Sequence, residues 1–486
     1  MHRRMNQKIA VSVVYVSALF MSIMDSTIVN VALPTIGRQF KVAADSVDTV
    51  SIGYLVSLAV FIPVSGWLGD RIGSRRVMLG SMILFTVASA LCGLAQSLPQ
   101  LVFFRVLQGA GGGTMVPVGM ALMFRTFLPE ERVRASSILT IPTALAPALG
   151  PLIGGLFVTD LSWRWVFYVN LPIGTTVLIF GLTFLAPHKN DHAGRLDVMG
   201  FVLSGLGLGL TMYGVSEGPF KGWDHPVILA TMSVGSLLLV ALVFQELRSS
   251  HPLMDIRLFR DAQFRTSNMV SGFGAMALLG SSFISALFLQ NGLGLSALDS
   301  GLTTFPQAVG VMIGAQIVSR VLYPALGPRR VMFSGLLIVA VSLSLLSRVN
   351  VVADLWWMRL MMFFAGYGLA HVITSSQAAG FASIPASLMA RASTLFTSLR
   401  QLGGAVGVAT LSTVVAAIGP TVLHHGRAVP HLAAYHVAYL TAAGTALLAA
   451  IVALGFNDAA AARTMVRRKA RRSNTERTES IPVLDA

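Results

Sequence analysis

The fold is decided by the stretch Gly66-Trp-Leu-Gly-Asp70-Arg71-Ile-Gly73-Ser-Arg75-Arg76-Val-Met78, a charged turn between two long apolar segments. A shorter version, Gly327-Pro-Arg329-Arg330-Val331-Met332, returns 254 residues later. The same offset pairs Arg105 with Arg359. A register without gaps over so long a distance indicates an internal duplication. The sequence therefore predicts a duplicated membrane protein with a charged turn at matching places in each half.

The composition of the chain is that of a protein surrounded by lipid. Charged residues make up 11% of the 486 residues and hydrophobic residues 54%, against about 25% charged residues in a soluble domain. An apolar span needs about 20 residues. Fourteen such segments are predicted, at about 9–31, 48–68, 77–96, 99–124, 134–158, 164–186, 196–216, 226–246, 264–290, 297–319, 329–347, 355–380, 392–417 and 434–456.

The positive charge is distributed unevenly between the two sides of these spans. If the N-terminus is cytoplasmic, 26 of the 35 Lys and Arg residues face the cytoplasm and six face outward. This bias predicts that both termini are cytoplasmic. It also accounts for the net charge of +15 without a nucleic-acid partner.

The repeat divides the predicted spans into domains. A cytoplasmic tail, 1–8, precedes a six-helix bundle at 9–186, and a second six-helix bundle occupies 264–456. A linker at 187–263 contributes two inserted spans. A basic tail at 457–486 is expected to be disordered beside anionic headgroups. Duplicated halves of this kind are typical of secondary transporters, whose substrate site lies between the halves.

One acidic residue, Asp25, lies well inside a span. A carboxylate in hydrocarbon costs several kcal/mol and is a functional candidate by default. A rise of 1.5 Å per residue puts both Asp25 and Arg105 about 9 Å below the outer surface, so the two charges share a layer. We expect a pair that forms and breaks with conformation to load and release a proton; the alternative is a static ion pair that joins two helices. The repeat position of Asp25 is Leu279, so coupling is expected in the N-terminal bundle alone.

The charged turn is the predicted gate. An acid and several arginines beside a tight turn can hold helix ends together and release them; the alternative is a solvated basic loop. The predicted gating residues are Gly66, Asp70, Arg71, Gly73, Arg75 and Arg76. In the second copy the position of Asp70 is Pro324, so the acid function is expected to be lost there.

Two further sets of residues are singled out within the spans. Small residues let helices approach closely and prolines permit kinks, and span five carries Pro147, Gly150, Pro151, Gly154 and Gly155. Polar residues inside spans are either helix-packing contacts or the lining of a substrate cavity. The cavity candidates are Tyr54, Gln108, Asn170, Gln307, His371 and Arg400. No metal site is predicted, and the single cysteine, Cys92, excludes a disulfide framework.

These motifs resemble the major facilitator superfamily, and within it the fourteen-span drug:proton antiporters. The resemblance covers nearly the whole chain. It rests on Gly66-x-Leu68-x-Asp70-Arg71-x-Gly73-x-Arg75-Arg76, Arg105-x-x-Gln108-Gly109, Gly150-Pro151-x-x-Gly154-Gly155, the stretch from Asp25 to Pro34, and the stretch from Trp163 to Gly174. It implies proton coupling at Asp25 and Arg105, conformational gating at Gly66 to Arg76, and an antiporter rather than a symporter from the Gly150-Pro151 segment.

The resulting expectation is a proton:drug antiporter that exports amphiphilic organic compounds across the cytoplasmic membrane by alternating access. A dedicated exporter of one secondary metabolite, or a lipid flippase of the same fold, stays open. A single buried acid favours neutral or monocationic substrates over dications. No phosphate-binding loop is present, which disfavours an ATP-driven pump, and no cluster of acids or histidines suggests an enzyme. We expect no cofactor, lipid as the only other partner, and function as a monomer.

Overall fold

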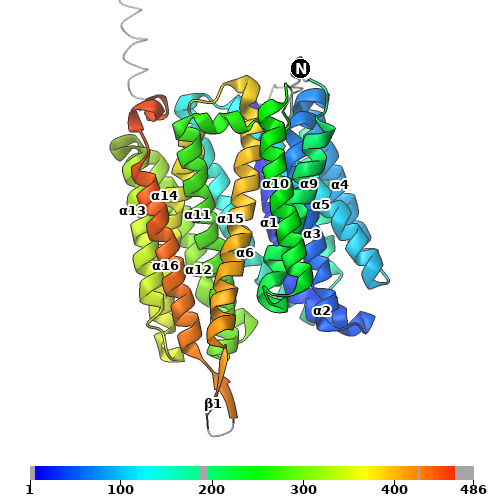
Figure 1. Ribbon diagram of the computed structural model, residues 1–486, viewed down its shortest axis with the longest axis vertical. Helices are drawn as coiled ribbons and strands as arrows, with labels where there is room; N and C mark the ends of the chain where they lie inside the picture. Colours follow the sequence, from blue (N-terminus) through cyan, green and yellow to red (C-terminus); the bar gives the residue numbers. More distant parts are fainter. Residues whose placement is uncertain (1–5, 187–193, 251, 425–426, 466–486) are drawn as a thin grey trace, which may run out of the picture.

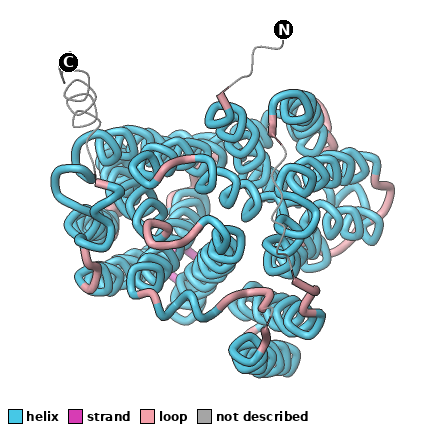
Figure 2. Tube along the Cα trace, turned by 90° about the horizontal axis from the view of Figure 1, so that it is seen from above, coloured by secondary structure: helices cyan, strands magenta, loops and turns pink. Residues whose placement is uncertain are grey.

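The computed structural model describes residues 6–186, 194–250, 252–424 and 427–465. These residues form fourteen helices of 15 residues or more, which stand roughly parallel (Figures 1 and 2). They are α1 (Gln7–Phe40), α3 (Thr49–Leu68), α4 (Ser74–Leu94), α5 (Leu98–Thr126), α6 (Arg132–Asp160), α8 (Asn170–Phe184), α9 (Val198–Lys221), α10 (Pro226–Arg248), α11 (Ala262–Leu287), α12 (Ala297–Ile317), α13 (Tyr323–Leu346), α14 (Leu355–Gly380), α15 (Met389–Ile418) and α16 (Leu432–Leu454).

Short elements connect the long helices. Two are single helical turns, α2 (Ala44–Val47) and α7 (Trp165–Tyr168). The wide π turns are η1 (Gly69–Gly73), η4 (Phe288–Gly292) and η5 (Val318–Leu322), and the tight 3₁₀ turns are η2 (Pro129–Glu131), η3 (Ile256–Arg260), η6 (Val352–Asp354), η7 (Ala386–Leu388) and η8 (Asp458–Thr464).

Eleven segments of the described residues are long and apolar enough to cross a membrane. Two of them, Thr49–Leu94 and Leu298–Leu346, run through two long helices each. The chain is therefore a multi-pass membrane protein with a helical fold, while the count of fourteen spans stays a prediction. We call the end of the molecule where α1 begins and α16 ends the terminal face (top of Figure 1) and the opposite end the hairpin face.

The long helices form two packed groups. The first group, α1 to α8, and the second group, α11 to α16, each have an interior cluster of buried apolar side chains, and a further cluster joins the two groups. Helices α9 and α10 pack against each other, and α9 also lies against α3 and α15. The inserted pair thus contacts both groups from one side.

The prediction of a purely helical chain missed one element. Strands β1 (Thr421–His424) and β2 (Arg427–Pro430) form an antiparallel hairpin at the hairpin face (Figure 1). The pairing is short and lies outside the helix bundle. A two-stranded hairpin of this length adds little stability of its own.

The expectation of a disordered tail after residue 457 is wrong for its first part. Helix η8 packs on the terminal face, with Ala461 buried and the Thr464 hydroxyl 2.8 Å from that of Tyr323. Asp458 accepts a hydrogen bond of 2.9 Å from the backbone N–H of Arg329. A carboxylate therefore does serve the second charged turn, although it comes from the chain end and not from position 324. The basic residues from 466 to 486 lie outside the described residues.

Candidate functional site

Asp25 lies at the centre of a closed polar cluster in the first group. Its carboxylate is 0% exposed and pairs with the Arg105 guanidinium through Oδ2. Its other oxygen, Oδ1, accepts hydrogen bonds from Gln108 Nε2 at 2.8 Å and from Asn170 Nδ2 at 3.0 Å. Helices α1, α5 and α8 thus each contribute to the same carboxylate.

The Arg105 guanidinium is buried as completely as its partner. Its Nη1 also donates to Gln108 Oε1 at 2.7 Å, and its Nε donates to the Val50 carbonyl at 3.2 Å. The guanidinium carbon lies 4.2 Å from the centre of the Tyr54 ring, in cation–π geometry. The arginine is held by α3 as well as by the carboxylate, so it has contacts that survive a change in charge at Asp25.

A second layer of hydrogen bonds fixes the two amides. Ser89 Oγ on α4 accepts from Gln108 Nε2 and from Asn170 Nδ2, each at 3.1 Å, and donates to the Phe167 carbonyl at 2.9 Å. Two buried polar atoms of this cluster have no partner within the described residues, namely Arg105 Nη2 and Asn170 Oδ1. The cluster therefore has one donor and one acceptor beside the ion pair that make no hydrogen bond.

Burial decides how much this ion pair matters. A buried pair is costly to break on one side, at about 3–5 kcal/mol, because the remaining charge is left without compensation. If Asp25 lost its negative charge, the positive charge of Arg105 would stay buried without its partner and would carry this free-energy cost. The free energy of the cluster therefore depends strongly on whether both charges are present.

Helix α6 packs closely on α1 next to Asp25. A Cβ on Gly150 would lie 2.1 Å from Thr27 Oγ1, and one on Gly154 would lie 2.9 Å from a side-chain carbon of Ile28, whereas one on Gly155 would meet nothing within 4 Å. Helix α6 continues unbroken through Pro142, Pro147 and Pro151. Two of the predicted glycines thus act as contact points with the helix that carries Asp25.

The predicted gating stretch is not a loop. Helix α3 runs through Gly66 into the π turn η1, and Arg75 and Arg76 lie in the first turn of α4. Gly73 has a φ of 101°, which only glycine adopts readily. The turn therefore connects two helices directly and brings their ends together at the terminal face.

The partner of Asp70 is an arginine that the sequence analysis did not single out. Asp70 accepts a hydrogen bond from Arg125 at 2.9 Å, and both side chains are buried. Of the predicted arginines, Arg75 donates to the Leu182 carbonyl at 2.6 Å, whereas Arg71 and Arg76 are exposed. The buried ion pair of the turn thus joins η1 to the end of α5.

Several contacts hold the two groups together at the terminal face. Arg125 Nε donates to the Ala386 carbonyl at 3.1 Å, and Arg132 donates to the Phe381 carbonyl. The Phe124 and Phe381 rings stack with their centres 4.7 Å apart. Helices α5 and α6 of the first group are therefore bonded to the segment between α14 and α15 of the second.

Helix α3 contributes a further contact to the same junction. Ser65 Oγ lies 3.3 Å from Thr394 Oγ1, and a Cβ on Gly66 would lie 2.8 Å from that same oxygen. The junction is completed by a hydroxyl pair one helical turn deeper, Thr140 and Thr374, at 3.2 Å. These contacts close the path between the groups at the terminal face.

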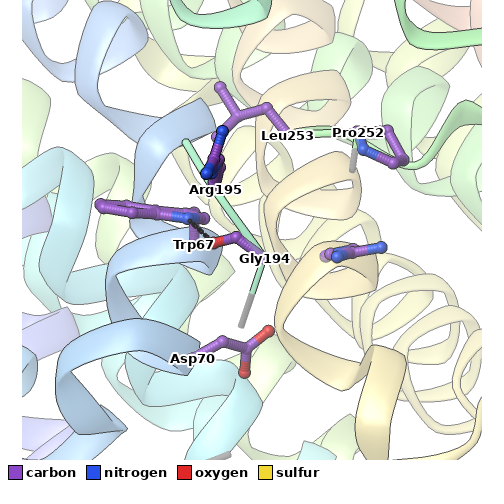
Figure 3. A pocket seen from close by; sticks show the side chains of 7 residues that line it. Trp67, Asp70, Gly194, Arg195, Pro252 and Leu253 are labelled. Atoms are coloured by element: carbon purple, nitrogen blue, oxygen red, sulfur yellow. Dashed lines mark hydrogen bonds between the residues drawn. The ribbon is translucent and has the colours of Figure 1, made fainter. Parts of the chain in front are cut away.

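The linkers on either side of the inserted helices line a small cleft beside Asp70 (Figure 3). It is lined by Trp67, Asp70, Gly194, Arg195, Pro252, Leu253 and Arg391. The Trp67 indole donates to the Gly194 carbonyl at 3.0 Å. Arg391 on α15 lies 3.8 Å from Asp255. The two linkers of the inserted pair thus contact α3 beside the charged turn and α15.

The predicted cavity residues fall into three places. Tyr54, Gln108 and Asn170 belong to the Asp25 cluster. Gln307 and His371 are packing residues of the second group: a Cβ on Gly366 would lie 2.0 Å from the Gln307 carbonyl oxygen, and His371 Nδ1 is 2.8 Å from the Tyr367 carbonyl. Arg400, on α15, stands apart from both sets.

Among the residues that sequence reasoning missed, Ser89 belongs to the Asp25 cluster and Arg125 pairs with Asp70. Ser89 is one of many serines in apolar spans, and nothing in its neighbours marks it. Arg125 had a usable signal, because it is a basic residue in the last turn of a long span that ends at the same face as the charged turn. Its pairing with Asp70 depends on how α5 packs against η1, which the sequence pattern does not specify.

Comparison with known proteins agrees with this arrangement. Residues 15–408 match the model of the Major Facilitator Superfamily. The chain is 35% identical over 432 residues to the multidrug resistance protein Stp of Mycobacterium tuberculosis, covering 86% of this chain and 78% of that protein. It is 31% identical over 468 residues to the putative multidrug resistance protein MdtD of Yersinia enterocolitica, covering 94% and 97% of the two chains.

Two solved structures share the fold. The human organic anion transporter MFSD10 aligns with a TM-score of 0.65 at 17% identity, covering 92% of this chain and 99% of that one. The proton:xylose symporter XylE aligns with a TM-score of 0.63 at 13% identity, covering 92% and 95%. The charged turn, Arg105 and the two helix groups thus belong to a chain that matches transporters in sequence and in fold. The chain belongs to the Major Facilitator Superfamily, a family of membrane transporters and not of enzymes, and is of its multidrug efflux type.

Proposed function

We propose that this transporter exports amphiphilic organic compounds from the cell in exchange for protons, with Asp25 as the proton site. The observation that carries the proposal is the fully buried pair of Asp25 and Arg105 with its two amide partners. The names of relatives such as Stp and MdtD support efflux of drugs as the task. The cell membrane is the proposed location, and the proton gradient is the proposed energy source, without a cofactor.

The cluster has the parts that a proton step needs. When Asp25 takes up a proton, its carboxyl group becomes a donor. Asn170 Oδ1, which has no partner in this structure, is an acceptor that a turn of the amide brings to that proton. Arg105 keeps its contacts with Val50 and the Tyr54 ring. Protonation thus replaces a charge pair with a neutral hydrogen bond without leaving the carboxyl group unpaired.

A chain of contacts links this step to the terminal face. Asp25 shares α1 with Thr27 and Ile28, which touch Gly150 and Gly154 of α6. The other end of α6 carries Arg132, which is bonded to the second group. A shift of α1 on protonation therefore acts on a helix that closes the terminal face. Opening that face and closing the other is the alternation that export requires.

The terminal face, proposed as cytoplasmic from the charge bias, is closed in this structure. Substrate would then leave toward the hairpin face in this state and enter from the terminal face in the other. A dedicated exporter of one metabolite and a lipid flippase use the same alternation, and both remain alternatives. We also propose that the protein functions as a monomer.

Proton movement in energised inside-out membrane vesicles tests the proposal. A pH-quenched dye reports the acid lumen, and a panel of lipophilic compounds of either charge is added. We expect compounds of the panel to release lumenal protons in the parent and in Asp160→Asn, which removes an exposed acid at the end of α6, but not in Asp25→Asn. Equal release in Asp25→Asn would contradict the proton site, and no release by the parent would contradict drug antiport.

A further inference from the structure

Arg400 is a deeply placed charge that the proposed proton step does not use. It lies 11 residues into α15 from Met389, which is about 16 Å along the helix. The described residues offer it no salt bridge or hydrogen bond. An intramembrane arginine is costly and is a functional candidate by default. A charge of this kind, retained without a protein partner, points to a partner that is absent from the structure.

The surroundings of Arg400 are rich in hydrogen-bond donors. Ser393 and Thr397 precede it by seven and three residues, so the three side chains share one face of α15. Both hydroxyls are buried and have no partner within the described residues. Across the junction, the phenol of Tyr15 on α1 is also buried and unpartnered, and it lies within electrostatic range of Arg400. Three unpartnered hydroxyls, two on the face of α15 that carries Arg400 and one on α1, thus belong to the same part of the interface between the helix groups.

Among the residues that the structure describes, no free negative charge balances this group. Asp25, the acid of the first group, is completely buried and bound to Arg105, Gln108 and Asn170. Arg400 nevertheless keeps accessible surface, although it lies deep among the helices. The place where the two groups meet therefore combines positive charge and donors with the buried apolar side chain of Phe396, one helical turn before Arg400 on the same helix.

We infer that Arg400, with Ser393, Thr397 and Tyr15, receives the anionic group of the substrate, so that the exported compounds are amphiphilic organic anions. A guanidinium flanked by hydroxyls fits a carboxylate, sulfonate or phosphate through paired, charge-assisted hydrogen bonds. The adjoining apolar side chain suits the remainder of an amphiphile. This inference rests on the proposed export function. It replaces the expectation of neutral or monocationic substrates, which considered Asp25 without Arg400.

Two dyes with the same ring skeleton and opposite charge test the inference. Fluorescein is the anion and rhodamine 123 is the cation, and their efflux is measured in proteoliposomes of the purified transporter under an imposed pH gradient. We expect the parent to transport fluorescein faster than rhodamine 123. Arg400→Gln should slow fluorescein about tenfold or more, in line with the loss of a hydrogen-bonded charge, and leave rhodamine 123 as fast or faster.

Variants separate this role from a structural one. Arg400→Lys keeps the charge but not the paired geometry, so it should recover part of the fluorescein rate. Tyr15→Phe removes one donor and should slow fluorescein alone. Arg359→Gln is the matched control, because Arg359 lies in the first turn and a half of α14 and stacks on the exposed Trp356. It should transport both dyes at the parent rate, and size-exclusion elution of every variant reports folding.

The outcomes also distinguish this inference from the proposed function. Transport of rhodamine 123 but not of fluorescein by the parent would overturn the inference and leave export standing. An unchanged fluorescein rate in correctly folded Arg400→Gln would overturn it as well. Transport of neither dye by the parent would contradict export of amphiphiles, and the inference would fall with it.

Discussion

Gly66 offers a direct way to alter the conformational equilibrium. In Gly66→Ala the new Cβ would lie 2.8 Å from Thr394 Oγ1 and 3.3 Å from the Ala390 carbonyl oxygen. Thr394 cannot easily turn away, because its hydroxyl donates to that carbonyl at 3.0 Å and contacts Ser65. The clash joins α3 to α15, so it exists only while the terminal face is closed.

The size of the effect follows from this geometry. Overpacking a tight contact costs about 1–3 kcal/mol. When the cost falls on one of two states, it shifts the equilibrium between them about 5–150-fold. Gly66→Ala should therefore enrich the state that is open at the terminal face, without disturbing the fold of either helix group.

Spin-label distance measurements report this shift. One pair of labels at Ile72 and Ser387 spans the two groups at the terminal face, and a second pair at Leu161 and Val351 spans them at the hairpin face; all four positions are exposed. Cys92 is buried and need not be replaced. In Gly66→Ala we expect a longer distance to gain population at the terminal face and a shorter one at the hairpin face.

The control is Gly80→Ala, because a Cβ at Gly80 would meet nothing within 4 Å. It should leave both distance distributions as in the parent. If Gly66→Ala also left them unchanged, the closed junction would not depend on the contact between α3 and α15, and the reasoning would be refuted.

Three further predictions concern other contacts. Arg125→Gln leaves the buried Asp70 without its charge partner, at a cost of about 3–5 kcal/mol. The midpoint of thermal unfolding should fall by several degrees, and adding Asp70→Asn should restore part of the loss. An unchanged unfolding midpoint would show that the pair does not stabilise the turn. Gly150→Val should abolish transport, because even its Cβ would lie 2.1 Å from Thr27 Oγ1, whereas Gly155→Ala has open space; equal transport rates in vesicles would exclude close packing of α6 on α1. Asp458→Ala removes the acceptor for the Arg329 N–H and should cost about 0.5–2 kcal/mol of local stability. Backbone hydrogen exchange at 327–332 should be faster in Asp458→Ala than in the parent, but not in Asp458→Asn. Equal exchange rates in all three proteins would show that this hydrogen bond does not stabilise the turn.

The helices and the ion pair were accessible to sequence reasoning for physical reasons. Hydrocarbon allows few charges, so Asp25 and Arg105 stood out, and helical rise placed them at one depth. The duplication located the charged turns. These signals depend on composition and on spacing along the chain. Both can be determined from the sequence without knowing how the helices pack.

The remaining contacts depend on packing between distant segments. Asp70 was expected to act with the arginines of its own turn, but Arg125 reaches it from α5. The acid of the second turn is Asp458, far along the chain from Gly327. The linker before the inserted helices contacts Trp67, beside the charged turn, through the Gly194 carbonyl, a backbone atom that carries no sequence signal. The unpartnered state of Arg400 likewise appears only when every neighbouring helix is in place.

Uphill transport in proteoliposomes tests the central claim most directly. The lumen is made acidic relative to the bath, with a dye that the parent exchanges in vesicles, and its content is measured after lysis at a fixed pH. The account predicts that the parent accumulates the dye above its bath concentration as protons leave, whereas Asp25→Asn only equilibrates it. Accumulation by Asp25→Asn equal to that of the parent would contradict proton coupling at Asp25.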